Sequence, residues 1–258
     1  MWIVTGILGC VLGSAITALL LRRRASGPAG PRDSLRQTVM RGIAHEIRNP
    51  LNTMSITLQL LEEDLAGESE PDRDAVLADV GRVRREVDRL ERILSDFQRY
   101  ARMQFRPDDM DIGALVNETL DFMEAEAARA GVEITRSVPQ GVAAVADPAL
   151  LRQAFLNVIV NAFQAIGEDG RLSVTVAAVG TDVVVSFADT GPGMDEAARR
   201  RAFEPYYSTK EDGTGLGLAV VSEVAEMHGG AADAKASPGA GTTVSLRIPL
   251  PTHASAIE

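Results

Sequence analysis

The chain has 258 residues, of which 45% are hydrophobic and 24% are charged, and its formal net charge is −10. This balance is typical of a globular protein with a core of its own. The negative charge argues against direct nucleic-acid binding, because a phosphate backbone requires a basic surface. The single cysteine, Cys10, excludes a disulfide within one chain and fits a reducing compartment.

The N-terminal segment, residues 1–21, carries no charged side chain. As a helix it would span roughly 30 Å, the thickness of a bilayer core. A cleaved signal peptide is the alternative, but no basic residue precedes the apolar run and no good small-residue cleavage site follows it. Three arginines, Arg22 to Arg24, come next and should stay in the cytoplasm. The sequence therefore predicts a single-pass transmembrane helix in the cytoplasmic (inner) membrane, with the catalytic part of the chain inside.

A helical hairpin is predicted after a Gly-, Pro-, Ala- and Arg-rich linker at residues 22–33. Apolar residues recur at spacings of three and four over residues 35–65 and again over residues 76–101, as one apolar helix face requires. A break at residues 66–71 separates the two helices, so the hairpin should occupy residues 34–104. Two such stripes bury poorly in one hairpin, which favours a four-helix bundle made by two chains. A coiled coil without chemistry would give the same periodicity.

The remainder, residues 107–251, alternates helix and strand patterns before a short tail at residues 252–258. Asp147 and Pro148 indicate a helix start, with Asp as N-cap and Pro as the first helical residue. Several helices over one mixed sheet make an α+β domain. Residues 190–214 are rich in Gly, Pro and charge and predict a long irregular loop. The expected helices are 112–129, 148–166 and 216–228, and the expected strands are 132–138, 142–146, 172–179, 183–188, 232–236 and 243–248.

One histidine stands out in the first helix. His45 lies two positions from both Ile43 and Ile47, which is about 200° around a helix, so it should point away from the apolar stripe. An exposed histidine is usually only a solvated side chain. Here Glu46 follows directly, and Pro50 sits inside the helix, where it removes a backbone hydrogen bond. Neutral imidazole is a capable nucleophile, and a carboxylate beside it can orient the ring and accept a proton.

The sequence around this histidine, GIAHEIRNPL at residues 42–51, resembles the phosphoacceptor box of the sensor histidine kinases of two-component signalling. The resemblance implies that His45 is phosphorylated and that Glu46 helps as a base. It also implies that Asn49 positions a water for removing phosphate from a partner protein. The fold that it implies is a dimerisation and phosphoacceptor hairpin followed by an α/β sandwich ATP-binding domain of the Bergerat type.

Two asparagines of the predicted helix 148–166, Asn157 and Asn161, lie four residues apart on one face. Two exposed asparagines would be ordinary, but Asn is a modest helix former and two on one face of an apolar helix need an explanation. The stretch is similar to the family's N box, which implies contacts with the phosphates of ATP and with Mg²⁺. An amide oxygen suits this hard cation, so Asn161 is the expected metal ligand.

Three further motifs follow, two of which are weak alone, and all five occur in the order that the family has. The resemblance implies that Asp189 accepts a hydrogen bond from the adenine amino group, while Gly191 and Gly193 let the base approach. Lys210 lies in a segment similar to the family's lid and should contact phosphate. A glycine-rich helix start offers backbone N–H groups to phosphate. There the resemblance assigns nucleotide contacts to Thr214, Gly215, Leu216 and Gly217.

The expected function is that of a homodimeric membrane kinase. It would phosphorylate His45 from ATP with Mg²⁺ and pass the phosphoryl group to an aspartate in the receiver domain of a separate response regulator. An ATPase chaperone or mismatch-repair protein would lack the phosphoacceptor box. A non-enzymatic membrane scaffold and a phosphatase-biased family member, in which Asn49 matters most, stay open. His228 is expected to be structural.

Overall fold

The computed structural model describes residues 31–67, 72–210 and 213–250, with side chains from residue 42 onward. The predicted transmembrane helix at residues 1–21 and the tail at residues 252–258 lie outside the described residues.

Two long helices form the predicted hairpin. Helix α2 (Pro31–Ala66) begins inside the segment predicted as a linker, and α3 (Arg73–Ala101) begins at an N-cap, Asp72, whose carboxylate accepts a hydrogen bond from the Asp74 N–H. Pro50 lies inside α2, as the sequence indicates, and it is buried. An ion pair of 3.8 Å between Glu46 and Arg89 joins the two helices.

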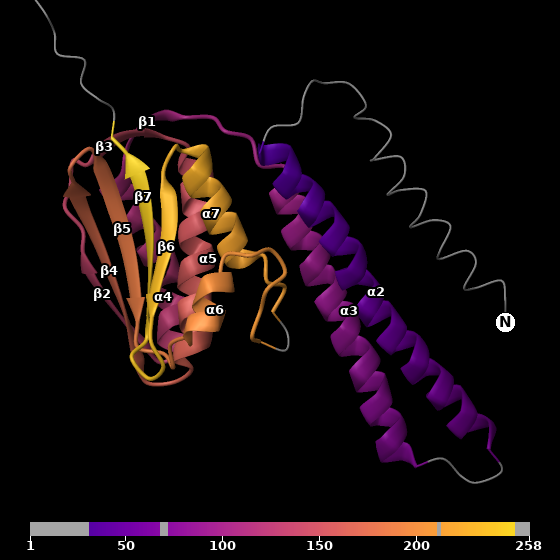
Figure 1. Ribbon diagram of the computed structural model, residues 1–258. Coiled ribbons are helices and arrows are strands. Elements are labelled where there is room, and N and C mark those ends of the chain that lie inside the picture. Colours follow the sequence, from indigo (N-terminus) through magenta and orange to yellow (C-terminus); the bar gives the residue numbers. More distant parts are fainter. Residues whose placement is uncertain (1–30, 68–71, 211–212, 251–258) are drawn as a thin grey trace, which may run out of the picture. The chain divides into compact units, whose positions relative to one another are not determined.

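The second part of the chain is built on a five-stranded sheet with the order β2-β4-β5-β7-β6 (Figure 1). Only the β2–β4 pair is parallel, and the other neighbours are antiparallel. The mixed sheet predicted from the sequence is therefore confirmed. Its strands are β2 (Val132–Ser137), β4 (Gly170–Val179), β5 (Asp182–Asp189), β6 (Ala231–Ala236) and β7 (Thr242–Pro249).

Helices α4 (Ile112–Arg129), α5 (Pro148–Ile166) and α7 (Gly217–Met227) lie together on one face of this sheet (Figure 1). Their apolar sides and the inner face of the sheet make the core, where the rings of Phe155 and Phe187 are 5.6 Å apart. Within the described part of the chain, α5 alone is long and apolar enough to cross a membrane, but 44% of that stretch is buried. Its apolar character is that of a core helix.

Two short elements differ from the sequence prediction. Strand β1 (Asp108–Asp111) pairs antiparallel with β3 (Ala143–Ala146) and makes a separate two-stranded sheet. The loop predicted for residues 190–214 contains a helix, α6 (Glu196–Arg201), whose N-cap is Asp195. Both elements depend on few residues, so periodicity could not predict them.

Candidate functional site

The predicted phosphoacceptor, His45, lies on α2 with an exposed side chain, as its position relative to Ile43 indicates. Glu46, the next residue, is partly buried and paired with Arg89 on α3. Because Pro50 has no N–H, the carbonyl of Glu46 loses its usual donor four residues on. The Thr53 hydroxyl donates to the carbonyl of Asn49 at 3.2 Å in the same turn. Asn49 is itself exposed, so His45 and Asn49 are accessible at one stretch of helix, with the partly buried Glu46 between them in the sequence.

The two predicted asparagines of α5 face the start of α7. The Asn157 amide donates to the carbonyl of Gly217 at 3.2 Å. A Cβ added to Gly217 would lie only 3.2 Å from the amide nitrogen of Asn161. The side-chain amides of the N box and the glycine-rich loop, separated by about 60 residues of sequence, therefore meet in space.

Asp189 ends β5 and is held in place by backbone donors. Its Oδ1 accepts from the N–H groups of Gly191 at 2.9 Å and Thr242 at 3.1 Å. Burial raises the pKa of Asp189, while those two hydrogen bonds and the charge of Lys210 act in the opposite direction. Gly193 has φ +72°, and a side chain there would collide with the carbonyl group of Ser237. Glycine is required here because the two backbone segments pack so closely.

Lys210, in the predicted lid, lies near Asp189 and α5. Its ammonium donates to the side-chain carbonyl of Gln164 on α5 at 2.7 Å. Desolvation lowers the pKa of Lys210, and the nearby charge of Asp189 partly offsets that effect. The lid lysine, the predicted adenine-binding aspartate and α5 are thus neighbours, and Gln164 is a polar side chain here that the motifs did not identify.

The glycine-rich loop ends at α7, and the N-terminus of this helix is available to an anion. Leu216 is the N-cap residue and is buried, and no side chain of a described residue caps the helix. The first N–H groups of a helix have no partner within the helix and favour a phosphate. This arrangement fits the triphosphate of a nucleotide.

The described residues offer few protein ligands for a metal ion. Among the described residues, no group of three or more His, Cys, Asp or Glu side chains could hold a metal ion. Mg²⁺ commonly keeps several waters and takes most of its remaining ligands from a substrate's phosphates. The amide of Asn161 beside a phosphate site fits that mode, and a cage made only of protein ligands does not.

Two side-chain contacts and one backbone conformation were not predicted from the sequence. The Thr214 hydroxyl donates to Oδ2 of Asp96 on α3 at 2.7 Å. Tyr206 adopts φ +65°, which is rare for a residue with a side chain. His228, expected to be structural, accepts from the Asp147 N–H at 2.9 Å through Nε2, and its Nδ1 lies 2.7 Å from the Val224 carbonyl. It joins α7 to the start of α5 and lies apart from the nucleotide residues.

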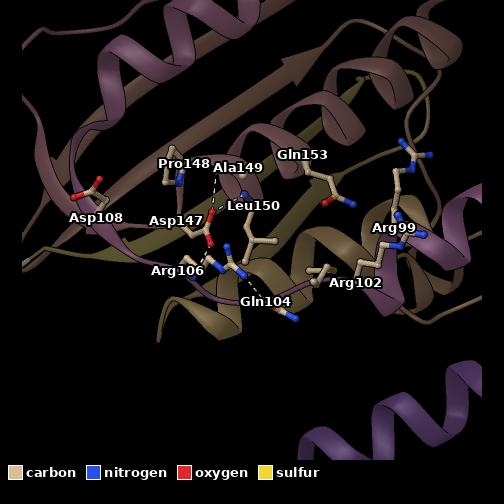
Figure 2. Close-up of a pocket in the computed structure, with 11 residues that line it drawn as sticks. Arg99, Arg102, Gln104, Arg106, Asp108, Asp147, Pro148, Ala149, Leu150 and Gln153 are labelled. Carbon is tan, nitrogen blue, oxygen red and sulfur yellow. Dashed lines mark hydrogen bonds between the residues drawn. The ribbon is translucent and has the colours of Figure 1, made fainter. Parts of the chain in front are cut away.

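A cavity of about 720 Å³ opens where the end of α3 and the start of α5 meet (Figure 2). Arg99, Arg102 and Arg106 line it together with the first turn of α5. The Asp147 carboxylate, which also lines it, already accepts from the N–H groups of Arg106, Ala149 and Leu150. None of the predicted nucleotide residues contributes to the lining of this cavity.

Two family models match the chain. Residues 35–106 match the His Kinase A (phospho-acceptor) domain, and residues 146–252 match the Histidine kinase-, DNA gyrase B-, and HSP90-like ATPase. The first match covers the hairpin and the second covers most of the domain that holds the asparagines, Asp189 and the glycine-rich loop.

Individual proteins agree with these matches. Sensor histidine kinase ZraS of Klebsiella oxytoca is 35% identical over 212 residues, which are 81% of this chain and 45% of that protein. Nitrogen regulation protein NtrY of Azorhizobium caulinodans is 32% identical over 243 residues, which are 90% of this chain and 30% of that protein. The chain thus spans less than half the length of these relatives. The crystal structure of full-length ShkA in complex with AMPPNP is 29% identical with a TM-score of 0.58, and the match covers 85% of this chain and 47% of that one.

Proposed function

We infer the function of this chain from its family, because it belongs to the sensor histidine kinases of two-component signalling. It takes the γ-phosphoryl group of ATP onto His45 and passes that group to an aspartate in the receiver domain of a separate response regulator. The observation that carries this proposal is the exposed imidazole of His45 beside Glu46, in a chain whose second domain gathers the residues expected for ATP.

The chemical step is a direct displacement. A nitrogen lone pair of His45 forms a bond to the γ-phosphorus, and the bond from that phosphorus to the β–γ bridging oxygen breaks, which releases ADP. The imidazole N–H proton passes to the carboxylate of Glu46. The ion pair with Arg89 orients this carboxylate from the neighbouring helix. Catalysis rests mainly on position and on neutralising charge.

The nucleotide residues divide by what they can recognise. Asp189 accepts a hydrogen bond from the adenine amino group, and Gly191 and Gly193 leave room for the base. Lys210 and Asn157 act near the phosphates. When bound, Mg²⁺ would neutralise phosphate charge, with Asn161 as its protein ligand. The phosphates themselves meet the N–H groups of the glycine-rich loop, residues 214–217.

A second copy of the chain is the proposed partner of the hairpin. Large apolar side chains of the predicted stripes are exposed, from 41% for Val87 to 55% for Leu65, and Leu58, Val80 and Leu94 are among them. Leaving such a row in water is unfavourable, whereas a dimeric four-helix bundle would bury it. We place the hairpin at residues 34–104 and the ATP-binding domain at residues 107–251, with residues 1–21 as a membrane anchor.

The phosphorylated residue can be identified by the chemistry of its bond. The full chain in detergent micelles, given γ-labelled ATP and Mg²⁺, should take up label that mild acid removes and alkali preserves, as a phosphoramidate requires. His45→Gln should abolish this label and leave nucleotide affinity unchanged. Asn49→Ala, tested on a phosphorylated response regulator, should slow removal of its phosphate. Acid-labile label in the His45→Gln variant would overturn the proposal.

A further inference from the structure

Tyr206, in the lid, is packed against the phosphoacceptor helix. A Cβ added to Gly42 of α2 would overlap the Tyr206 ring, with Cζ at 3.0 Å and two other ring carbons closer still. Gly42 lies three residues before His45, which is one helical turn. The ring therefore occupies the space of a missing side chain directly next to the residue that accepts the phosphoryl group.

The backbone of Tyr206 is tied to the glycine-rich loop. Its N–H donates to the carbonyl of Gly215 at 3.0 Å. A Cβ on Gly215, which has φ +65°, would lie 2.5 Å from the carbonyl carbon of Tyr206. The two residues pack backbone to backbone, so the Tyr206 ring and the phosphate loop should move together as one unit.

The conformation of Tyr206 is itself unusual. A non-glycine residue at φ +65° is strained, and such strain persists only where the surroundings hold it in place. The surroundings here are Gly215 on one side and α2 on the other. Burial raises the pKa of Tyr206, and the charge of Glu46 acts in the same direction, opposed by a hydrogen bond with the Ile43 backbone. The phenol thus lies within electrostatic reach of the proposed base.

We propose that Tyr206 is a positioning residue for phosphoryl transfer: its ring, seated on Gly42, holds the phosphate-binding loop in register with His45. This inference rests on the proposed function. It assigns Tyr206 no contact with ATP, and it gives Gly42 a role that depends on the absence of a side chain. Misplacing reactants by about 1 Å can cost roughly 10²-fold in rate, so a small displacement of the loop should be measurable.

The test is Gly42→Ala in the full chain in detergent micelles. Alanine is a better helix former than glycine, so the helix should be preserved, and its Cβ must push the Tyr206 ring away. The rate of labelling of His45 at saturating ATP should fall by about tenfold or more. The affinity for a non-hydrolysable ATP analogue, measured by calorimetry, should change by less than about twofold. Gly81→Ala is the matched control, because the nearest atom to its new Cβ is 3.5 Å away on the exposed side chain of Arg85.

Variants of Tyr206 test whether the specific contact between its ring and Gly42, and not packing in general, sets the rate. Tyr206→Phe keeps the ring and should retain most of the rate, whereas Tyr206→Ala should lose it to the same extent as Gly42→Ala. The double variant should be no slower than either single variant, because both remove one contact. Independent, multiplying losses would overturn the inference, as would an unchanged rate in Gly42→Ala or a loss of affinity that accounts for the lower rate. A parent chain without acid-labile label would overturn the proposed function itself, and a parent chain labelled at His45 beside a fully active Gly42→Ala would overturn only the role of Tyr206.

Discussion

Asp96 should weaken ATP binding in the native chain, and its removal should therefore strengthen it. The Thr214 hydroxyl donates to Asp96 at 2.7 Å, yet the same hydroxyl is expected to contact phosphate. A hydroxyl has one proton to donate, so it cannot serve the carboxylate and a phosphate oxygen at once. Binding ATP must break the bond from Thr214 to Asp96.

The size of the effect follows from what is broken. A hydrogen bond to a charged group contributes about 1.5 kcal/mol at the lower end of its range. The Asp96 side chain is 22% exposed, so water can replace a lost partner, and the lower end of the range applies. Since about 1.4 kcal/mol corresponds to tenfold in affinity, Asp96→Ala should tighten binding of a non-hydrolysable ATP analogue by about tenfold. Asp96→Asn keeps an acceptor without its charge and should give an intermediate gain.

Titration calorimetry of the full chain at two salt concentrations measures both variants. Asp88→Ala, an exposed acidic residue on the same helix, is the control for a general change in charge and should have little effect. Asp96 also pairs with Arg99, an ion pair between neighbouring turns of one helix that is worth only about 0.5 kcal/mol. Unchanged or weaker affinity in Asp96→Ala would refute the competition for the Thr214 hydroxyl.

Three more outcomes are expected. Asp189→Asn should weaken analogue binding by about tenfold or more, because its amide can turn a donor toward the adenine amino group; equal affinity in calorimetry would remove Asp189 from the site. Val87→Asp should weaken dimerisation seen by light scattering, because a charge would enter the seam between two hairpins. Burial lowers the pKa of His228, so its contribution to stability is full above its unfolded pKa of about 6.5 and is lost as the pH falls below it. The parent should therefore lose more melting temperature than His228→Gln between pH 7.5 and pH 5.5, and parallel curves would contradict this assignment.

The helices were predictable where a local signal marks their ends. Asp147 caps α5 through the N–H groups of Ala149 and Leu150, with Pro148 in the first turn, and the predicted bounds 148–166 match. Strand β1 has no such signal, because its sequence DDMD lacks an apolar alternation and it is a strand only through pairing with β3. Helix α6 did carry one, since the Asp195 side chain accepts from the Ala198 N–H, but six residues are too few for a periodic pattern.

The candidate site divides in the same way. Residues that belong to short motifs, such as His45 and Asp189, could be chosen from the sequence because their neighbours along the chain define them. Contacts between distant segments could not. Thr214 and Asp96 are separated by 118 residues, and the sequence around either residue contains no pattern that predicts a contact with the other. The left-handed backbone of Tyr206 is set by Gly215 and α2, so only the folded chain reveals it.

The two contacts between the glycine-rich loop region and the hairpin differ in what ATP does to them. The bond from Thr214 to Asp96 uses a proton that phosphate also needs, so nucleotide binding opposes it. The contact between the Tyr206 ring and Gly42 is a van der Waals contact, and it uses no hydrogen-bonding group that a phosphate needs. Binding of ATP should therefore break the contact of the loop with α3. The contact of Tyr206 with α2, the helix that carries His45, should remain. Removal of the first contact by mutation should therefore raise the affinity for ATP without changing the rate, and removal of the second should lower the rate without changing the affinity.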